Sequence, residues 1–153
     1  ALAVPAASIN FRPLEQILQD ADTRLESAEG HGFEKLVARL YAERSRKGLG
    51  DFNLTSQVQA YWDRKGIEID MVALDETSQR VRLATCKRSV HRVIPDLAVF
   101  DGHIARFLEA MPRFVDWTVE KAAITPQHSA DSRAWLAARG WIPQDLTDLV
   151  QGL

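Results

Sequence analysis

Two carboxylates and one lysine stand on neighbouring segments whose spacing suits phosphodiester chemistry. Glu68 and Asp70 lie two residues apart in the segment IEIDMVALD, and Lys87 ends the segment RLATCK. Residues two apart in a strand point to the same face, so Glu68 and Asp70 are predicted to project together. The same rule places Thr85 and Lys87 on one face. If the hairpin register joins these faces, the Asp70 carboxylate meets the Lys87 ammonium.

This set of side chains could serve metal-dependent hydrolysis of a phosphodiester. A divalent cation neutralises phosphate charge and lowers the pKa of a bound water. Magnesium takes oxygen ligands, usually one or two carboxylates plus waters, and a nearby lysine can stabilise the developing charge. We therefore expect Mg²⁺ or Mn²⁺ as cofactor if the site is active, and no cofactor otherwise. The alternative is that Glu68 and Asp70 face solvent on an edge strand and that Lys87 is a surface lysine.

The segments around these residues predict a three-stranded meander between helices. Period-two patterns cover residues 56–63, 67–74 and 80–87, with turn residues between them. A helix precedes them, and its apolar face is formed by Phe33, Leu36, Val37, Leu40 and Tyr41. The other predicted elements are a helix opening at Ile94-Pro95-Asp96, a strand over 114–124, a helix over 129–139 and a helix over 143–153. The fold class expected is α/β, with a mixed four-stranded sheet (helix, three-stranded meander, crossover helix, strand, helix) flanked by helices.

Four short motifs together resemble a known nuclease superfamily. They are Phe33-Glu34, Trp62-Asp63-Arg64-Lys65-Gly66, Glu68-Ile69-Asp70 and Thr85-Cys86-Lys87. This combination looks like the PD-(D/E)XK, or restriction-endonuclease-like, superfamily. More narrowly, it resembles the domain of unknown function at the C-terminus of archaeal and bacterial DEXX-box ATPases. The resemblance covers residues 32–89 by motif, and it implies a restriction-endonuclease-like fold with an ATPase module upstream.

The resemblance also implies roles for individual residues. Asp70 would be the central metal ligand, Lys87 the catalytic lysine and Glu34 an auxiliary acid that reaches in from the helix. Thr85 stands where the family has its second carboxylate, and a neutral hydroxyl adds no charge to hold a divalent ion. Glu68 or Glu34 could compensate for Thr85. The candidate metal ligands are therefore Asp70, Glu34 and Glu68, and these with Lys87 are the candidate catalytic residues.

Positive charge is concentrated in the same part of the chain. Residues 32–92 contain 12 Lys and Arg against 8 Asp and Glu, whereas the remainder contains 7 and 13. A local positive field suits a polyanionic partner, and the alternative is an ordinary solvated surface. The candidate DNA-binding residues are Arg64, Lys65, Arg88 and Arg92.

Three functions are compatible with these patterns. The favoured one is a nuclease-like accessory domain of an ATPase, which binds DNA and has lost catalysis because of Thr85. The second is an active, divalent-metal-dependent DNA endonuclease. The third is a protein-interaction domain without catalysis. The chain has no glycine-rich P-loop, so it is not expected to bind a nucleotide in that manner.

Length and composition are those of a soluble globular domain. The chain has 153 residues, of which 46% are hydrophobic and 26% charged. We expect an N-terminal helix or connector over 1–31, with its helix over 11–28, and one domain over 32–153. No apolar run approaches the roughly 20 residues that cross a bilayer, and a single cysteine fits a reducing compartment. A cytoplasmic location without a membrane partner is expected. The four histidines lack zinc-like spacing and are expected at the surface or as caps.

Overall fold

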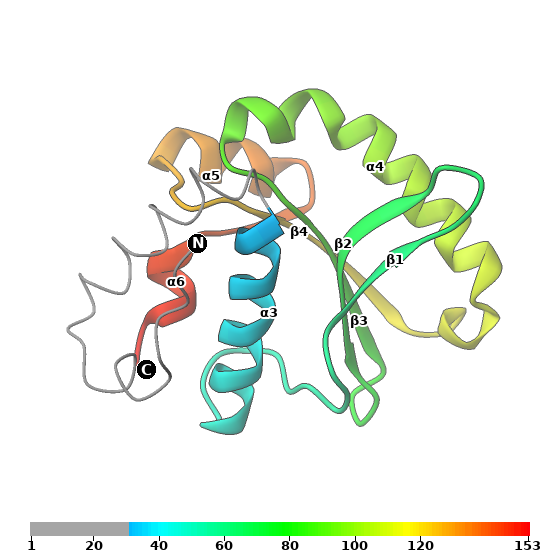
Figure 1. Cartoon of the computed structure of the whole chain (residues 1–153), viewed down its shortest axis with the longest axis horizontal. Coiled ribbons are helices and arrows are strands. Elements are labelled where there is room, and N and C mark those ends of the chain that lie inside the picture. Colours follow the sequence, from blue (N-terminus) through cyan, green and yellow to red (C-terminus); the bar gives the residue numbers. More distant parts are fainter. Residues whose placement is uncertain (1–30) are drawn as a thin grey trace.

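The computed structural model describes residues 31–153, which form a mixed sheet with helices on both faces (Figure 1). The helices are α3 (His31–Arg46), α4 (Val90–Ala110), the 3₁₀ turn η1 (Pro112–Phe114), α5 (Ala130–Ala138) and α6 (Leu146–Val150). The strands are β1 (Gln59–Trp62), β2 (Glu68–Asp75), β3 (Arg80–Cys86), β4 (Thr118–Ile124) and β5 (Trp141–Gln144). The helix predicted over 11–28, and almost all of the predicted connector 1–31, lie outside the described residues.

The sheet has the strand order β1-β2-β3-β4-β5. Its first three strands pair antiparallel and confirm the predicted meander. β4 pairs with β3 in parallel, and β5 pairs with β4 in parallel. Parallel neighbours require a crossover connection, which α4 supplies before β4 and α5 supplies before β5. The mixed α/β class is therefore confirmed, and the predicted order of elements is confirmed from α3 to α5.

The sheet has five strands, which corrects the prediction of four. The additional strand, β5, lies at the edge beside the end of β4. Pro143 weakens the strand signal in the sequence, because proline is normally excluded from a strand except at an edge or a bulge. The segment 143–153, predicted as one helix, contains instead the end of β5 and the short helix α6.

Three further boundaries differ from the predictions. Strand β1 spans only Gln59–Trp62, within the predicted range 56–63. Helix α4 begins at Val90, before the predicted start at Ile94, and it contains Pro95. Val93 is fully buried, so packing keeps the turn that precedes the proline helical although Pro95 lacks an N–H. Strand β4 begins at Thr118, because the segment from Pro112 to Phe114 forms the 3₁₀ turn η1 instead of the start of the strand.

Each face of the sheet has its own apolar core. Helices α3 and α6 cover one face, and α4 and α5 cover the other (Figure 1). The predicted apolar face of α3 is confirmed, since Phe33, Val37, Leu40 and Tyr41 are buried and Leu36 is partly buried against the same cluster. No helix among residues 31–153 is long and apolar enough to cross a membrane.

Candidate functional site

Asp70 and Lys87 lie together at one end of the sheet. Lys87 Nζ is 3.4 Å from Asp70 Oδ2, and the exposed fraction of the side chain is 5% for Asp70 and 34% for Lys87. The antiparallel pairing of β2 with β3 produces this approach, because its last pair places Met71 opposite Ala84. Asp70 comes just before Met71 and Lys87 comes three residues after Ala84, so both lie where the ladder between β2 and β3 ends. A buried carboxylate and a partly exposed ammonium therefore face each other beside solvent.

The two backbones separate at this end, and the side chain of Asp70 takes the place of a backbone partner. Strand β3 continues beside β4 as far as Cys86, whereas its pairing with β2 ends at Ala84. The N–H of Cys86 donates to Asp70 Oδ2 over 2.8 Å, and the N–H of Lys87 donates to Ile124 on the other side. The carboxylate is thereby fixed by the backbone, as a preorganised site requires.

Thr85 reaches the same carboxylate from β3. Its hydroxyl donates to Asp70 Oδ2 over 3.4 Å, and its side chain is buried. The contacts of the carboxylate gather on Oδ2, whereas Oδ1 accepts no hydrogen bond from the part of the chain that the structure describes. Oδ1 of Asp70 is therefore the oxygen left for a cation or a water molecule.

Cys86 lies among the side chains under α3 and is buried. Burial, followed by the negative charges of Asp70 and Glu34, raises the pKa of the Cys86 thiol well above its ordinary value, although Lys87 opposes this. A thiol with a raised pKa is a poor nucleophile near neutral pH. Cys86 is therefore a packing residue.

The two remaining candidate acids, Glu34 and Glu68, lie differently with respect to the pair of Asp70 and Lys87, which we call the centre. Glu34 is in the first turn of α3, and its charge acts on Cys86 from that face of the sheet. Glu68 is exposed, and its backbone N and O contact Nδ1 of His103 on α4 at 3.3 and 3.0 Å. Within the described residues, no hydrogen bond or ion pair joins the Glu68 side chain to Asp70. Among residues 31–153, no group of three or more His, Cys, Asp or Glu is arranged to hold a metal ion.

The four candidate DNA-binding residues fall into two pairs. Arg64 and Lys65 are exposed in the turn between β1 and β2. Arg88 is half-buried and Arg92 is exposed, and both follow Lys87 around the start of α4. The second pair therefore extends the positive charge that begins at Lys87.

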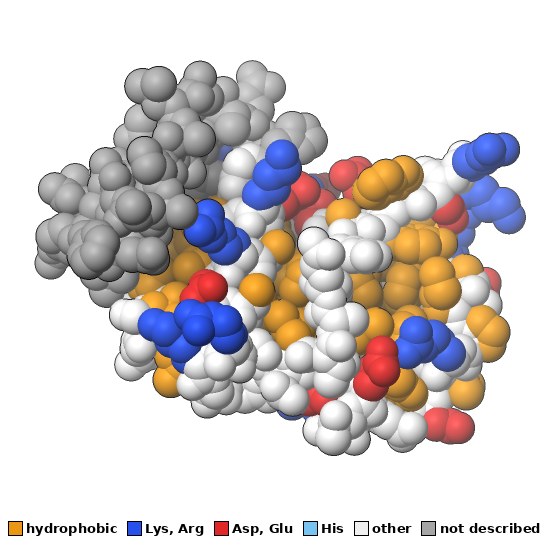
Figure 2. Space-filling model, turned by 60° about the horizontal axis from the view of Figure 1, so that its bottom comes forward, with side chains coloured by type: hydrophobic (Ala, Val, Ile, Leu, Met, Phe, Trp, Pro, Cys, Tyr) orange, Lys and Arg blue, Asp and Glu red, His pale blue; other side chains and the backbone are white. Residues whose placement is uncertain are grey.

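A basic groove, which we had not predicted, runs along α3. Its volume is ≈ 740 Å³, and it lies between α3 and the segment 54–58. The cations Lys35, Arg39 and Arg46 line it, and none of its lining residues within 31–153 is acidic. Figure 2 shows Lys and Arg side chains near both margins of one face, with a mostly uncharged surface between them. Helical spacing of Lys35 and Arg39 is visible in the sequence, but the segment that completes the groove is brought there only by the fold.

A second buried polar centre surrounds Arg82, which sequence reasoning also missed. Its side chain is 0% exposed, and its guanidinium contacts Asp51 at 3.0 Å and Glu120 at 3.2 Å. It also donates to the hydroxyl of Tyr41 over 3.1 Å and lies over the ring of Phe52. Burial opposes the charge of Arg82, but Tyr41 and Asp51 raise its pKa. The cluster joins α3, β3, β4 and the loop after α3.

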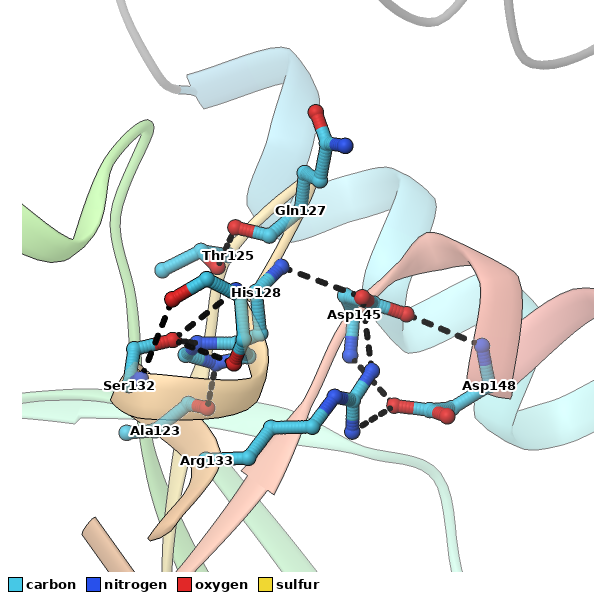
Figure 3. Close-up of polar contacts among 9 residues, drawn as sticks. Ala123, Thr125, Gln127, His128, Ser132, Arg133, Asp145 and Asp148 are labelled. Atoms are coloured by element: carbon cyan, nitrogen blue, oxygen red, sulfur yellow. Dashed lines mark hydrogen bonds and ion pairs between the residues drawn. The ribbon is translucent and has the colours of Figure 1, made fainter. Parts of the chain in front are cut away.

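A third polar cluster fixes the C-terminal helices (Figure 3). The imidazole of His128 lies 3.0 Å from the hydroxyl of Ser132 and 3.1 Å from the carbonyl of Ala123. The backbone N–H of His128 donates to Asp145, which also forms an ion pair of 2.7 Å with Arg133. His128 is buried, so of the two expected positions, at the surface or as a cap, the surface position is wrong, because tertiary contacts supply its polar partners. The cluster is a structural joint between α5 and α6.

Comparisons with known proteins place the sequence in a family. Residues 5–93, more than half of the chain, match a family described as archaeal and bacterial proteins of unknown function (DUF234). This range includes α3 and the meander with Asp70 and Lys87. No curated protein and no solved structure matches the chain. The chain thus belongs to this family of archaeal and bacterial proteins.

Proposed function

We propose that this chain is a PD-(D/E)XK-like, restriction-endonuclease-like domain that binds DNA without cleaving it, as the C-terminal accessory domain of a DEXX-box ATPase. The observation that carries the proposal is the 3.4 Å approach of Lys87 Nζ to Asp70, with Thr85 on the same carboxylate. The order of helix, meander, crossover helix and parallel strand supports the assignment of the fold. The family match over residues 5–93 supports the association with an ATPase.

The donor set around Asp70 does not fit a tightly held divalent cation. Asp70 contributes one carboxylate with an available Oδ1, and Thr85 contributes only a neutral hydroxyl that donates to the same residue. Mg²⁺ usually binds one or two carboxylates together with substrate phosphates and waters. One carboxylate, already compensated by Lys87, leaves little negative charge for such an ion. The Asp70–Lys87 centre is therefore assigned to DNA contact and not to hydrolysis.

The charges beside the centre are suited to the DNA backbone. The Lys87 side chain is one-third exposed, and Arg88 and Arg92 follow it at the surface around the start of α4. Within the described residues, neither arginine forms an ion pair with an acidic side chain. Unpaired cations that lie together attract phosphates and release condensed counterions on binding. Arg88 and Arg92, together with Lys87 beside its partner Asp70, are the proposed phosphate contacts.

The proposal is tested by measuring duplex DNA binding of the 153-residue chain at increasing salt concentration. Fluorescence anisotropy with a labelled duplex should show affinity that falls steeply with salt, because phosphate contacts release counterions. The double variant R88Q/R92Q should bind more weakly, and its log–log salt slope should decrease by about two.

The matched control is Arg113→Gln in η1. Arg113 is an exposed arginine whose partner, Glu76, follows β2 at the end away from Asp70. This variant should bind the duplex as the wild type does. If the wild type binds no DNA, the proposal is wrong, and the surface is better explained by a protein partner.

The available Oδ1 of Asp70 and the nearby charge of Glu34 favour a second candidate function, an active Mg²⁺- or Mn²⁺-dependent DNA endonuclease. In that case the wild type should cleave DNA when Mg²⁺ or Mn²⁺ is added. Asp70→Ala and Lys87→Ala should each abolish cleavage, whereas Cys86→Ala should preserve it. A wild type without divalent-dependent cleavage excludes this candidate and agrees with the first.

A further inference from the structure

The hairpin between β1 and β2 presents a tryptophan to solvent. Trp62 is 73% exposed, which is unusual for so large an apolar side chain. It is the last residue of β1 and pairs with Glu68 at the start of β2. The neighbouring Tyr61 packs edge-to-face on Phe107 of α4. The strand is therefore held by the core, while the indole of Trp62 contributes little to that core.

The turn that follows Trp62 is rigid. The carboxylate of Asp63 accepts the N–H of Lys65 at 2.8 Å and the N–H of Ile67 at 3.1 Å. The N–H of Asp63 donates to the carbonyl of Ile67, and Gly66 adopts the left-handed conformation that closes the turn. These bonds order the backbone before any ligand binds, so less conformational entropy is lost on binding.

Two cations accompany the exposed ring. Arg64 and Lys65 are exposed in the same turn, and neither forms an ion pair with another described residue. Trp62 pairs with Glu68, which lies two residues before Asp70 in β2. Glu68 and Asp70 are therefore separated by about 7 Å along the strand. A DNA strand with phosphates beside Lys87, as in the proposed function, would therefore pass close to this hairpin.

We propose that Trp62 stacks on an unpaired base of single-stranded DNA while Arg64 and Lys65 contact the adjoining phosphates. An aromatic face beside cations is the usual means of binding a single strand without reading its sequence. Exposed tryptophans also anchor protein partners, but two unpaired cations beside the ring favour a polyanion. This inference rests on the proposed function and adds the substrate class, namely DNA with unpaired bases.

The test compares two labelled single strands that differ only in the presence of bases. One is oligothymidylate of about 12 nucleotides, within the site sizes of single-strand binders, and the other has the same backbone with abasic positions. The wild type should bind oligothymidylate more tightly, by on the order of tenfold. Trp62→Ala should lose this difference and bind both probes as the wild type binds the abasic probe, whereas Trp62→Phe should keep part of it.

Two further variants serve as controls. One removes the charge beside the ring, and the other removes an exposed apolar side chain elsewhere. The double variant R64Q/K65Q should weaken the binding of both probes by the same factor, because both carry the same phosphates. Val115→Ala removes another highly exposed apolar side chain and should leave both affinities unchanged. Thermal unfolding of each variant should match the wild type, because these side chains contribute little to the core.

The outcomes distinguish this inference from the proposed function. A wild type that binds duplex DNA with equal affinity for the two single-stranded probes overturns the role of Trp62 and leaves the proposed function intact. Trp62→Ala with an unchanged preference for bases also overturns it and assigns the ring to a protein interface. A wild type that binds neither duplex nor single strands removes both proposals.

Discussion

At the scale of single residues, the centre is defined by which groups share the carboxylate of Asp70. Oδ2 of Asp70 receives the N–H of Cys86, the hydroxyl of Thr85 and the ammonium of Lys87. Because the hydroxyl of Thr85 is neutral, only one negative charge lies at this buried position. A neutral hydroxyl adds no charge that would help to hold a divalent cation.

Thr85→Glu should convert the centre into a cation site. Without divalent ions the variant should unfold at a lower temperature than the wild type, because two carboxylates repel each other where burial weakens screening. Added Mg²⁺ or Mn²⁺ should raise the unfolding temperature of the variant and not that of the wild type, since a ligand that binds only the folded state stabilises it. Divalent-dependent DNA cleavage should appear or increase in the same variant.

Thr85→Gln is the matched control, because it has nearly the size of Thr85→Glu without the charge. It should show no response to divalent ions in unfolding temperature or in cleavage. Equal responses of both variants, or no metal response of Thr85→Glu, would contradict the position that we assign to Thr85.

Cys86 provides a separate residue-scale prediction, because it is the only cysteine of the chain. Its burial raises the pKa of the thiol, so the folded protein should react slowly with a thiol reagent near pH 8, where an exposed cysteine reacts readily. Reaction should become fast in denaturant. The measurement is the rate of labelling with a chromogenic disulfide, and fast labelling of the folded chain would show that Cys86 is accessible.

At the scale of elements, Asp145 connects the short helix α6 to α5 and to the end of β4. It caps α6 by accepting the N–H of Asp148, and it receives the N–H of His128 and the ion pair of Arg133 (Figure 3). Burial alone would raise the pKa of Asp145, but the two backbone donors and then Arg133 hold it below its ordinary value. The charged form of Asp145 therefore stabilises the fold.

Asp145→Asn should lower the free energy of unfolding at pH 7 by about 1–3 kcal/mol. Asparagine can still cap the helix. Its amide N–H₂, however, would face the N–H of His128 and the guanidinium of Arg133, which are themselves donors. Because the folded pKa of Asp145 is below the unfolded one, its contribution is present above the unfolded pKa and lost as pH falls through the folded pKa. The difference between wild type and variant should therefore shrink below about pH 4. Urea unfolding at several pH values measures it, and a constant difference would contradict this account.

The elements themselves were predictable to different degrees. The apolar face of α3 and the alternation of the meander are local patterns, and the structure confirms both. β5 was missed because Trp141–Gln144 is short and contains a proline. The first turn of α4 was missed because the burial of Val93, a tertiary effect, outweighs the local signal of Pro95.

At the scale of the whole molecule, Arg82 joins parts of the chain that are far apart in sequence. Its guanidinium contacts Tyr41 of α3, Asp51 of the following loop and Glu120 of β4. Nε of Arg82 has no hydrogen-bond partner within the described residues, and a cavity of ≈ 30 Å³ adjoins the cluster. This volume is sufficient for a water molecule.

Arg82→Met should lower the free energy of unfolding by about 3 kcal/mol, because it leaves the acidic partner Glu120 without one of its cations. Arg82→Lys should recover only part of the loss, since one ammonium cannot reach all the partners of a guanidinium. Urea unfolding measures both effects. The control is Arg113→Gln at an exposed position, which should change the free energy of unfolding by no more than about 0.5 kcal/mol. If Arg82→Met lowers the free energy of unfolding by no more than this control does, the buried cluster is not important for stability.

The sequence alone determined the α/β class, the meander and the expectation that Asp70 and Lys87 lie close together, because strand periodicity and a short hairpin turn are local properties. Tertiary structure decided which atoms share the Asp70 carboxylate, that the charge of Glu34 acts on Cys86, and that Arg82 and His128 are buried. These features depend on where the sheet separates and on which helices cover it. Such contacts join residues far apart in the chain, and no local pattern encodes them.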